Sequence, residues 1–176
     1  MKLVEIDEEN FDVIIDLRYA SKNNIIGEKI YQENKCFLLE KAAFMLKKAV
    51  KIAKDLGLII KIFDAYRPPY VQEKLWNYDP NPKFLTNPSK GSPHSKGIAI
   101  DCTLTHPSSG DLDMGTDFDD FTELAFHLSN GISQECRLNR IKLLSIMTLA
   151  GFDHYLNEWW HYQLFNSSAY SLIEKY

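Results

Sequence analysis

The central feature of the chain is the stretch Ser92-Pro93-His94-Ser95-Lys96-Gly97-Ile98-Ala99-Ile100-Asp101. It places the imidazole of His94 seven residues before the carboxylate of Asp101. Positions seven apart on an unbroken strand point to opposite faces, but Gly97 can adopt the backbone angles of a tight turn. We therefore predict that His94 lies on a loop and that Asp101 lies on the strand that follows. A carboxylate in an apolar strand needs a cation or hydrogen-bond donors, and a metal ion bound by both residues meets that need.

A third metal ligand can be found downstream, in the segment Glu158-Trp159-Trp160-His161. Histidine nitrogens and carboxylate oxygens both bind zinc, and a catalytic zinc usually has three protein ligands and an open water position. His94, Asp101 and His161 form such a set, which predicts one Zn²⁺ per chain. Zinc can lower the pKa of its bound water from about 15.7 to about 7, and Glu158 would then lie beside that water as general base.

Each half of this pattern also has a plain structural explanation. A single histidine beside an apolar strand can be a hydrogen-bonded core residue, and the downstream segment can be an amphipathic strand with two packing tryptophans. The ligand set suits zinc, although other divalent ions can occupy the same kinds of ligand. The two halves together, in this order, are what favour a metal site.

An apolar, β-branched segment, Leu58–Ala65, predicts a central strand that is buried on both faces. It leads into Asp64-Ala65-Tyr66-Arg67-Pro68-Pro69. Pro68 restricts Arg67 to an extended conformation, and the two prolines favour a helix that runs to about Asp79. Arg67 thus lies at the end of a rigid element, where its guanidinium can pair with Asp64 or donate to a ligand.

Taken together, these segments resemble the zinc D-alanyl-D-alanine metallopeptidases, and among them the dipeptidases of the vancomycin-resistance type. The resemblance covers the chain from about Asp16 to Phe165. It rests on the segments quoted above and on two more that occur in the family's order, Asp16-Leu17-Arg18-Tyr19 and Met114-Gly115-Thr116-Asp117-Phe118-Asp119.

The resemblance implies roles for further residues. In the family the arginine at the position of Arg67 stabilises the oxyanion that forms during hydrolysis, and Asp64 would orient it. The tyrosine and aspartate at the positions of Tyr19 and Asp119 hold the free ammonium group of the substrate. The serine two residues before the first histidine, here Ser92, would meet the carboxylate end.

The resemblance also implies the fold class: an α+β domain spanning residues 1–176, with a central antiparallel sheet, flanking helices and a zinc cleft on the sheet. The hydrophobic period predicts one helix over Lys35–Leu56, with Leu38, Ala42, Met45, Ala49, Ile52 and Leu56 on its buried face. Residues 1–30 read as irregular apart from a short strand near Val13–Leu17. The segment 80–92 reads as a loop that can wall the site.

The last third of the chain predicts one long helix and two short strands. Ser133 caps the helix, which runs to Ala150 before Gly151 and buries Leu138, Ile141, Leu144 and Met147. The strands are residues 152–155 and 159–165, with Trp159, His161 and Gln163 alternating with Trp160, Tyr162 and Leu164. Glu158 falls just outside the second strand.

Composition and charge narrow the function classes. The chain has 176 residues, 45% of them hydrophobic, with a net charge of −4 and no cluster of basic residues, which argues against a nucleic-acid partner. It has no apolar run of 18 residues, which argues against a membrane span. Cys36, Cys102 and Cys136 are widely spaced and odd in number, and the start lacks a secretory signal, so we expect reduced thiols and a cytoplasmic location. A signal removed before residue 1 would make the location periplasmic.

The expected activity is hydrolysis of D-alanyl-D-alanine, or of a close D,D-dipeptide, by metal-activated water. One alternative is a D-alanyl-D-alanine carboxypeptidase that trims peptidoglycan precursors, although an ammonium-binding Asp119 argues against it. Another is a non-catalytic zinc protein on the same scaffold, as in hedgehog-type signalling domains, although such a protein needs neither Glu158 nor Arg67. The activity could serve glycopeptide resistance, nutrient recovery or wall remodelling, and the sequence leaves the oligomeric state open.

Overall fold

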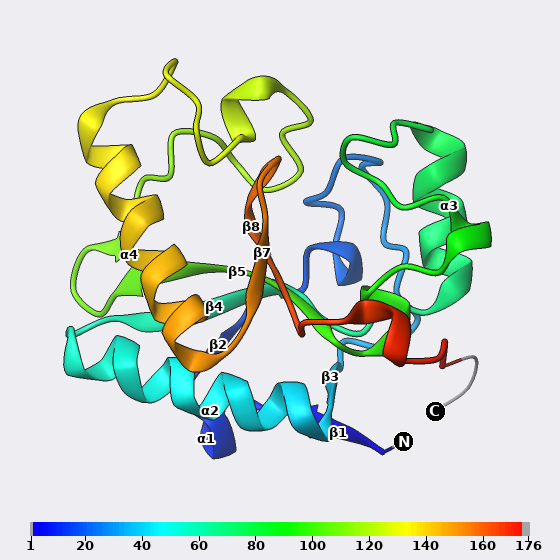
Figure 1. Cartoon of the computed structure of the whole chain (residues 1–176), viewed down its shortest axis with the longest axis horizontal. Helices are drawn as coiled ribbons and strands as arrows, with labels where there is room; N and C mark the ends of the chain where they lie inside the picture. The colour runs from blue at the N-terminus through cyan, green and yellow to red at the C-terminus, as the bar shows by residue number, and fades with distance from the viewer. Residues whose placement is uncertain (1, 174–176) are drawn as a thin grey trace.

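A six-stranded sheet forms the centre of the computed structural model, which describes residues 2–173 (Figure 1). Across the sheet lie β2 (Ile14–Ile15), β4 (Ile59–Asp64), β5 (Ala99–His106), β8 (Glu158–Gln163) and β7 (Asp153–Tyr155), and β6 (Gly110–Asp111) pairs with β5. All of these pairings are antiparallel except that of β2 with β4. The α+β class is therefore confirmed, with the correction that the sheet is mixed rather than wholly antiparallel.

The pairing of β4 with β5 forms the buried centre of the sheet. Both strands are buried over most of their length, and Ile60 and Ile62 pair with Leu104 and Cys102 in the core. The register shifts between Ile62 and Asp64, so that Asp64 lies opposite Asp101. This shift brings the polar ends of the two buried strands together at one edge of the core.

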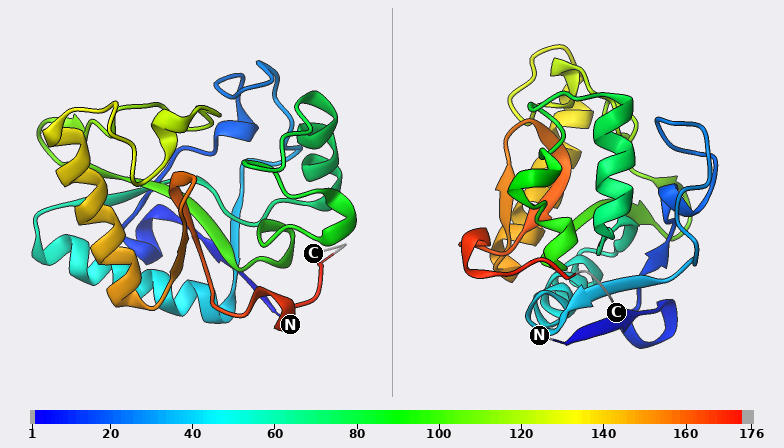
Figure 2. Two further views of the ribbon diagram at one scale, coloured as in Figure 1. Left: turned by 45° about the horizontal axis from the view of Figure 1, so that its top comes forward. Right: turned by 90° about the vertical axis from the view of Figure 1, so that its right-hand side faces the viewer.

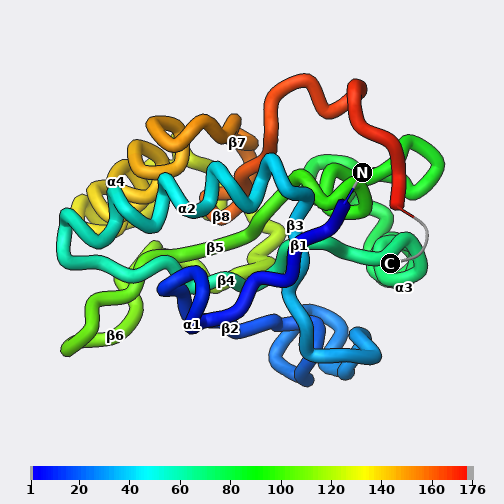
Figure 3. The backbone as a smooth tube through the Cα atoms, turned by 90° about the horizontal axis from the view of Figure 1, so that it is seen from below, coloured from blue at the N-terminus to red at the C-terminus, as the bar shows by residue number. Residues whose placement is uncertain are grey.

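Two long helices, α2 (Glu40–Asp55) and α4 (Gln134–Ala150), pack against one another and cover one face of the sheet (Figures 1 and 3). The expected ends of α4 are confirmed, because the Ser133 side chain accepts a hydrogen bond from the amide of Cys136 and Gly151 has φ 107°. The shorter α3 (Pro69–Tyr78) begins at the predicted prolines and lies away from these two helices (Figure 2).

The start of the predicted helix over residues 35–56 is wrong. Cys36–Leu39 forms a strand, β3, which pairs with β1 (Leu3–Ile6) in a separate two-stranded sheet, and the helix begins only at Glu40. Residues 1–30 contain the short strand predicted near Val13–Leu17, as β2, but the rest, expected to be irregular, also contributes β1 and the short helix α1 (Glu8–Phe11). Tertiary pairing overrode a local helical pattern, which propensity alone cannot anticipate.

The predicted buried face of α4 is also wrong in part. Leu138 and Ile141 are half exposed, whereas Leu143, Ile146, Met147 and Ala150 are buried together with two polar residues, Asn139 and Arg140. Polar residues on the buried face weaken the apolar period from which the face was predicted. On α2 the prediction is closer: Ala42 and Ala49 are buried, but Leu56 is 59% exposed beyond the helix end.

The turn predicted at Gly97 is present and needs glycine for two reasons. Gly97 has φ 69°, a left-handed conformation that costs other residues strain. A Cβ there would also lie 2.8 Å from Leu3 Cδ2 and 3.3 Å from the amide nitrogen of Leu39. The turn ends a short 3₁₀ segment, His94–Lys96, and leads into β5. Between residues 2 and 173 no helix is long and apolar enough to cross a membrane.

Candidate active site

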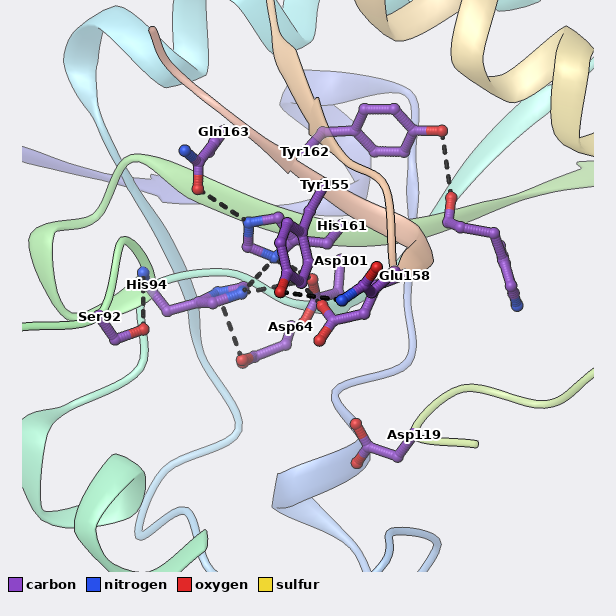
Figure 4. A network of polar contacts seen from close by, with 12 residues as sticks. Asp64, Ser92, His94, Asp101, Asp119, Tyr155, Glu158, His161, Tyr162 and Gln163 are labelled. Atoms are coloured by element: carbon purple, nitrogen blue, oxygen red, sulfur yellow. Dashed lines mark hydrogen bonds and ion pairs between the residues drawn. The ribbon is translucent and has the colours of Figure 1, made fainter. Parts of the chain in front are cut away.

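A cavity of about 260 Å³ opens beside the paired ends of β5 and β8. Eight of the nine residues predicted for the site line it: Tyr19, Arg67, Ser92, His94, Asp101, Asp119, Glu158 and His161. The ninth, Asp64, lies directly behind Arg67. Figure 4 shows most of these side chains converging on one point, with Asp119 set apart on a different segment.

The three predicted metal ligands meet at the centre of this group. Asp101 and His161 are paired residues on neighbouring strands, and His94 reaches them from the 3₁₀ turn. His161 Nδ1 lies 3.0 Å from Asp101 Oδ1 and 3.1 Å from His94 Nε2, and His94 Nε2 lies 3.3 Å from Asp101 Oδ1. Tetrahedral zinc with bonds of about 2.0–2.2 Å requires ligand atoms about 3.3–3.6 Å apart. The donor set therefore fits a metal ion after a small outward shift.

Hydrogen bonds behind the two histidines fix which ring nitrogen faces the cluster. The carbonyl oxygen of Ala65 can only accept, so it takes the proton of His94 Nδ1 at 2.7 Å. The side-chain oxygen of Gln163 likewise accepts from His161 Nε2 at 3.1 Å. The lone pairs of His94 Nε2 and His161 Nδ1 then face one another across 3.1 Å. Two facing lone pairs beside a carboxylate repel unless a cation lies between them, which is a second sign that the site fits a metal.

The two carboxylates nearest the histidines are perturbed in opposite directions. In the ion-free protein burial opposes the charge of Asp101, but His94 and His161, when protonated, outweigh it and hold the pKa of Asp101 well below its usual range. Glu158 is also buried, and its carboxylate lies 3.8 Å from His161 Nδ1. Burial raises the pKa of Glu158 to about 8. A bound divalent cation would lower that pKa, because a nearby positive charge favours the carboxylate.

Arg67 is buried between the metal cluster and the rest of the cavity. Its Nε donates to Asp64 Oδ2 at 2.8 Å, and its Nη1 donates to Gln72 Oε1 at 2.9 Å. Its Nη2 lies 3.3 Å from Asp101 Oδ2 and 2.8 Å from Asp64 Oδ2. The hydrogen bonds among these contacts use three of the five N–H donors of a guanidinium, so donor capacity remains for a ligand. The structure thus brings Asp64 and Arg67 into the predicted pair.

Asp119 and Tyr19 form a second polar group at another wall of the cavity. The Tyr19 hydroxyl donates to the two carboxylate oxygens of Asp119 at 2.9 and 3.2 Å. Asp119 has φ 61°, a left-handed conformation that Asp and Asn tolerate better than most residues. Burial raises the pKa of Asp119 to about 7. The ring of Tyr19 also lies under the Arg67 guanidinium, 5.0 Å from its centre, and so connects the two polar groups.

Ser92 is buried and lines the cavity as predicted, but its hydroxyl already has a partner. It accepts a hydrogen bond from the backbone amide of His94 at 3.3 Å. This bond closes the turn that aims the histidine at the cluster. The hydroxyl proton of Ser92 stays free to be donated, because the bond to His94 uses only a lone pair.

Three residues that support the site were not predicted. Gln163 fixes the ring of His161, Gln72 holds Arg67, and Tyr31 donates a hydrogen bond to Asp64. Only Gln163 left a signal, since it lies two residues after His161 on the same strand. Gln72 and Tyr31 come from a helix and a loop whose approach to Arg67 depends on tertiary structure.

The predicted alternation along the last strand holds only in part. Glu158 is the first residue of β8 rather than a residue outside it, and Glu158 and Trp160 line the cavity together with His161 and Gln163. Odd- and even-numbered positions of the strand both line the cavity, so its side chains do not alternate strictly between two faces. β8 pairs with β5 only from His161 onward, and its pairing with β7 shifts register near Tyr155.

The remaining histidines lie away from the metal cluster. His154 packs edge-on against His127, with ring centres 5.5 Å apart, and His106 is exposed and bonded to Ser108. In residues 2–173 His94, Asp101 and His161 form the one group of three metal-ligand side chains close enough to share an ion.

Comparison with known proteins agrees with this geometry. A family model described as D-Ala-D-Ala dipeptidase matches residues 1–175. The chain is 39% identical to a D-alanyl-D-alanine dipeptidase of Escherichia coli (strain K12), over 92% of this chain and 84% of that protein. It is 35% identical to the D-alanyl-D-alanine dipeptidase of Enterococcus faecium and 33% identical to that of Enterococcus faecalis (strain ATCC 700802 / V583). Both alignments cover 90% of this chain and 89% of the relative.

Proposed function

This chain belongs to the D-Ala-D-Ala dipeptidase family of metallopeptidases, and from that premise we propose that it hydrolyses D-alanyl-D-alanine, or a close D,D-dipeptide, with zinc. One observation carries the proposal. A single cavity holds a three-ligand metal set with a buried carboxylate beside it and, on another wall, an acidic residue suited to a free ammonium group. Together these features match the scissile bond and the free amino end of a short peptide substrate.

His94, Asp101 and His161 would hold the ion. When bound, zinc supplies Lewis-acid activation of the attacking water and polarisation of the scissile carbonyl. Two nitrogens and one carboxylate oxygen are ligands that zinc commonly takes in catalytic sites. The carbonyl of Ala65 and the amide of Gln163 hold the histidine rings in the matching tautomers.

Glu158 is the proposed general base. It accepts a proton from the attacking water and passes it to the nitrogen of the leaving amino acid. Its burial and raised pKa support both halves of this role, because a carboxylate whose pKa lies near neutrality can accept and then release a proton. Its distance of 3.8 Å from His161 places it beside the ligand set without making it a ligand.

Arg67 is the proposed oxyanion donor. As water adds to the scissile carbonyl, negative charge develops on its oxygen, and a guanidinium fixed in place stabilises that charge without reorganising. Asp64 and Gln72 hold the guanidinium from behind and leave a donor for the cavity. The buried position of Arg67 supports this role, since such contacts are stronger where water is excluded.

Asp119 and Tyr19 are proposed to bind the free amino group of the substrate, and Ser92 its carboxylate end. An ionised Asp119 attracts an ammonium group, whereas the amide of a longer or acylated peptide carries no charge. The pocket therefore discriminates against extended substrates by leaving Asp119 unpaired. This preference separates a dipeptidase from a carboxypeptidase that trims longer precursors.

The test is release of free D-alanine by the zinc-loaded protein, from D-Ala-D-Ala and from N-acetyl-D-Ala-D-Ala in parallel, with a chelator control. We expect cleavage of the free dipeptide alone, lost with chelator and restored by zinc. Cleavage of both peptides would replace the proposal with carboxypeptidase activity. Cleavage of neither would contradict it and leave the non-catalytic zinc protein as the better explanation.

A further inference from the structure

The polar residues buried on α4 point to a function for Arg140. Its side chain is 1% exposed, and its hydrogen bonds go to backbone carbonyls rather than to carboxylates. Burying a guanidinium is costly unless acceptors are supplied. An apolar residue at this position would pack against the sheet at no such cost. The arginine therefore needs an explanation beyond the packing of the helix.

The acceptors all belong to the segment that carries Asp119. Arg140 Nε donates to the Met114 carbonyl at 2.6 Å, and Nη1 donates to the carbonyls of Leu124 and Phe126, each at 2.9 Å. Met114 lies five residues before Asp119, and the other two lie five and seven residues after it. One planar side chain thus ties together both arms of the loop whose middle residue faces the cavity.

Neighbouring contacts hold the same segment from the same side. Asn139 donates to the Asp113 carbonyl at 3.0 Å, next to the first contact of Arg140. Trp159, the neighbour of Glu158, donates from its indole to Thr116 Oγ1 at 2.8 Å, and the Arg140 guanidinium lies 5.8 Å from the centre of that indole. The arginine therefore contacts both the loop and the strand that bears the proposed base.

The conformation of Asp119 agrees with this anchoring. A residue other than glycine with φ near 61° is strained, and such strain persists only where the surrounding structure fixes it. The segment between Met114 and Leu124 contains little regular structure of its own. Its geometry has to be imposed from outside, and the three carbonyl contacts of Arg140 are suited to impose it.

We propose that Arg140 is a positioning residue, which holds the loop of residues 112–127 in the shape that presents Asp119 to the amino end of the substrate. The inference rests on the proposed dipeptidase function for its effect on specificity. The anchoring of the loop does not depend on that function. Arg140 lies behind the loop and does not line the cavity, so it acts on the substrate through Asp119.

The test compares Arg140→Met and Arg140→Lys with the wild type and with Arg137→Met. Methionine keeps most of the length of the side chain but removes every hydrogen-bond donor. Lysine keeps the positive charge but lacks the planar set of N–H donors with which arginine binds several carbonyls at once. Arg137 lies one turn earlier on the same helix and is exposed, so its variant controls for the loss of an arginine from α4. If Arg140→Met fails to fold, Arg140→Lys carries the test.

Two measurements are made on each folded variant. Amide hydrogen exchange compares the loop of residues 112–127 with α2 and β4 in the same sample. Steady-state kinetics gives KM and kcat for D-Ala-D-Ala and the preference for it over N-acetyl-D-Ala-D-Ala, at a fixed zinc content. Hydrogen bonds to charged groups change affinity by about 10- to 100-fold. The Arg140 variants displace the Asp119 carboxylate rather than remove it, so we expect affinity for the dipeptide to fall by about tenfold, the lower end of that range.

We expect faster exchange confined to the loop, about a tenfold rise in KM for D-Ala-D-Ala, a smaller change in kcat and a reduced preference for the free dipeptide. A merely structural Arg140 would reduce the amount of folded protein but leave KM and the preference unchanged. Unchanged exchange in the loop, or an unchanged KM with unchanged preference, overturns the proposal. If the wild type cleaves neither peptide, the proposed function and its specificity corollary fail, and the exchange rates alone decide the anchoring.

Discussion

The two polar groups in the cavity are built in different ways. Two of the three proposed metal ligands, Asp101 and His161, face one another as paired residues of neighbouring strands, and His94 lies on the turn that leads into β5. Asp119 lies on a loop whose shape depends on side chains that reach in from α4 and β8. Backbone hydrogen bonds of the sheet fix two members of the first group, whereas the second group relies on a few side-chain contacts. We call His94, Asp101, His161 and Glu158 the metal half of the site, and Asp119 with Tyr19 the ammonium half. We expect the metal half to tolerate distant substitutions better than the ammonium half.

The two groups also differ in electrostatics. The histidines keep the pKa of Asp101 well below its usual range, as a metal ligand requires, while burial raises the pKa of Asp119 to about 7. A carboxylate with few compensating charges is poised to gain from an incoming ammonium group. One cavity thus contains a carboxylate already satisfied by the protein and another that a substrate would satisfy.

The largest effect is expected in the metal half, from Glu158→Gln. Glutamine keeps the size of the side chain but cannot accept the proton of the attacking water, and general bases contribute about 10²- to 10⁴-fold to turnover. We expect kcat to fall by that factor while one zinc ion stays bound per chain, measured by metal analysis of the purified variant. As a contrast, His161→Ala should lose both metal and activity. Substantial turnover in Glu158→Gln would remove this residue as the base.

Arg67→Lys tests the residue that joins the two halves. Lysine keeps the charge but not the fork that Asp64 and Gln72 hold, and losing one oxyanion donor costs about 10²- to 10³-fold in kcat. We expect a loss of that size with a smaller change in KM, measured by initial rates at several dipeptide concentrations. A change confined to KM would instead assign Arg67 to substrate binding.

The features that the sequence predicts correctly are those set by residues that lie close together in the chain. Gly97, His94 and Asp101 lie close together in the chain, and a turn at Gly97 followed by a strand predicts their arrangement. The strand β4 and the start of α3 followed equally from local apolar and proline signals. Here local rules and the final fold agree.

Other features depend on partners far away in the sequence. Cys36–Leu39 reads as the first turn of a helix until β1 is available to pair with it. Asn139 and Arg140 are not among the residues predicted to be buried on α4, because nothing in the local pattern reveals the loop carbonyls that they bind. The resemblance to a family pointed to Asp119, but its left-handed backbone and the anchoring from α4 left no mark that a residue pattern could detect.

Asp119→Asn is expected to affect the ammonium half alone. Asparagine tolerates the left-handed backbone and can still accept the Tyr19 proton, so the change removes charge with little change in shape. We expect KM for D-Ala-D-Ala to rise by about 10- to 100-fold, since hydrogen bonds to charged groups are worth about 1.5–3 kcal/mol. Any slow cleavage of N-acetyl-D-Ala-D-Ala should change much less. Equal losses on both peptides, in side-by-side assays, would show that Asp119 does not recognise the ammonium group.

Gln163→Leu tests how far the metal half depends on contacts outside its ligands. Leucine cannot accept the proton of His161 Nε2, so the ring loses the bond that sets its tautomer. Substituting such partners typically weakens metal affinity by about 10- to 100-fold, and we expect a loss in the lower part of that range because the strand still holds the ring. Competition with a chelating dye measures the affinity, and Gln32→Leu, outside the cavity, serves as control. An unchanged affinity would mean that the sheet alone orients the ligand.

The smallest effect should appear in stability, again at Asp119. Its folded pKa of about 7 lies above the unfolded value of about 3.9, so the folded state favours the protonated carboxyl. That contribution is fully present below about pH 4 and is lost as the pH rises towards 7. Asparagine cannot ionise, so Asp119→Asn should be more stable than the wild type at pH 8, by about 1–3 kcal/mol after allowing for solvent in the cavity, and little different at pH 4.5. Denaturant melts of the metal-free proteins at the two pH values measure this, with the exposed Asp117→Asn as control. A difference that does not depend on pH would trace the change to hydrogen bonding, whereas a gain limited to high pH would show that the protein keeps this carboxylate at the expense of its own stability.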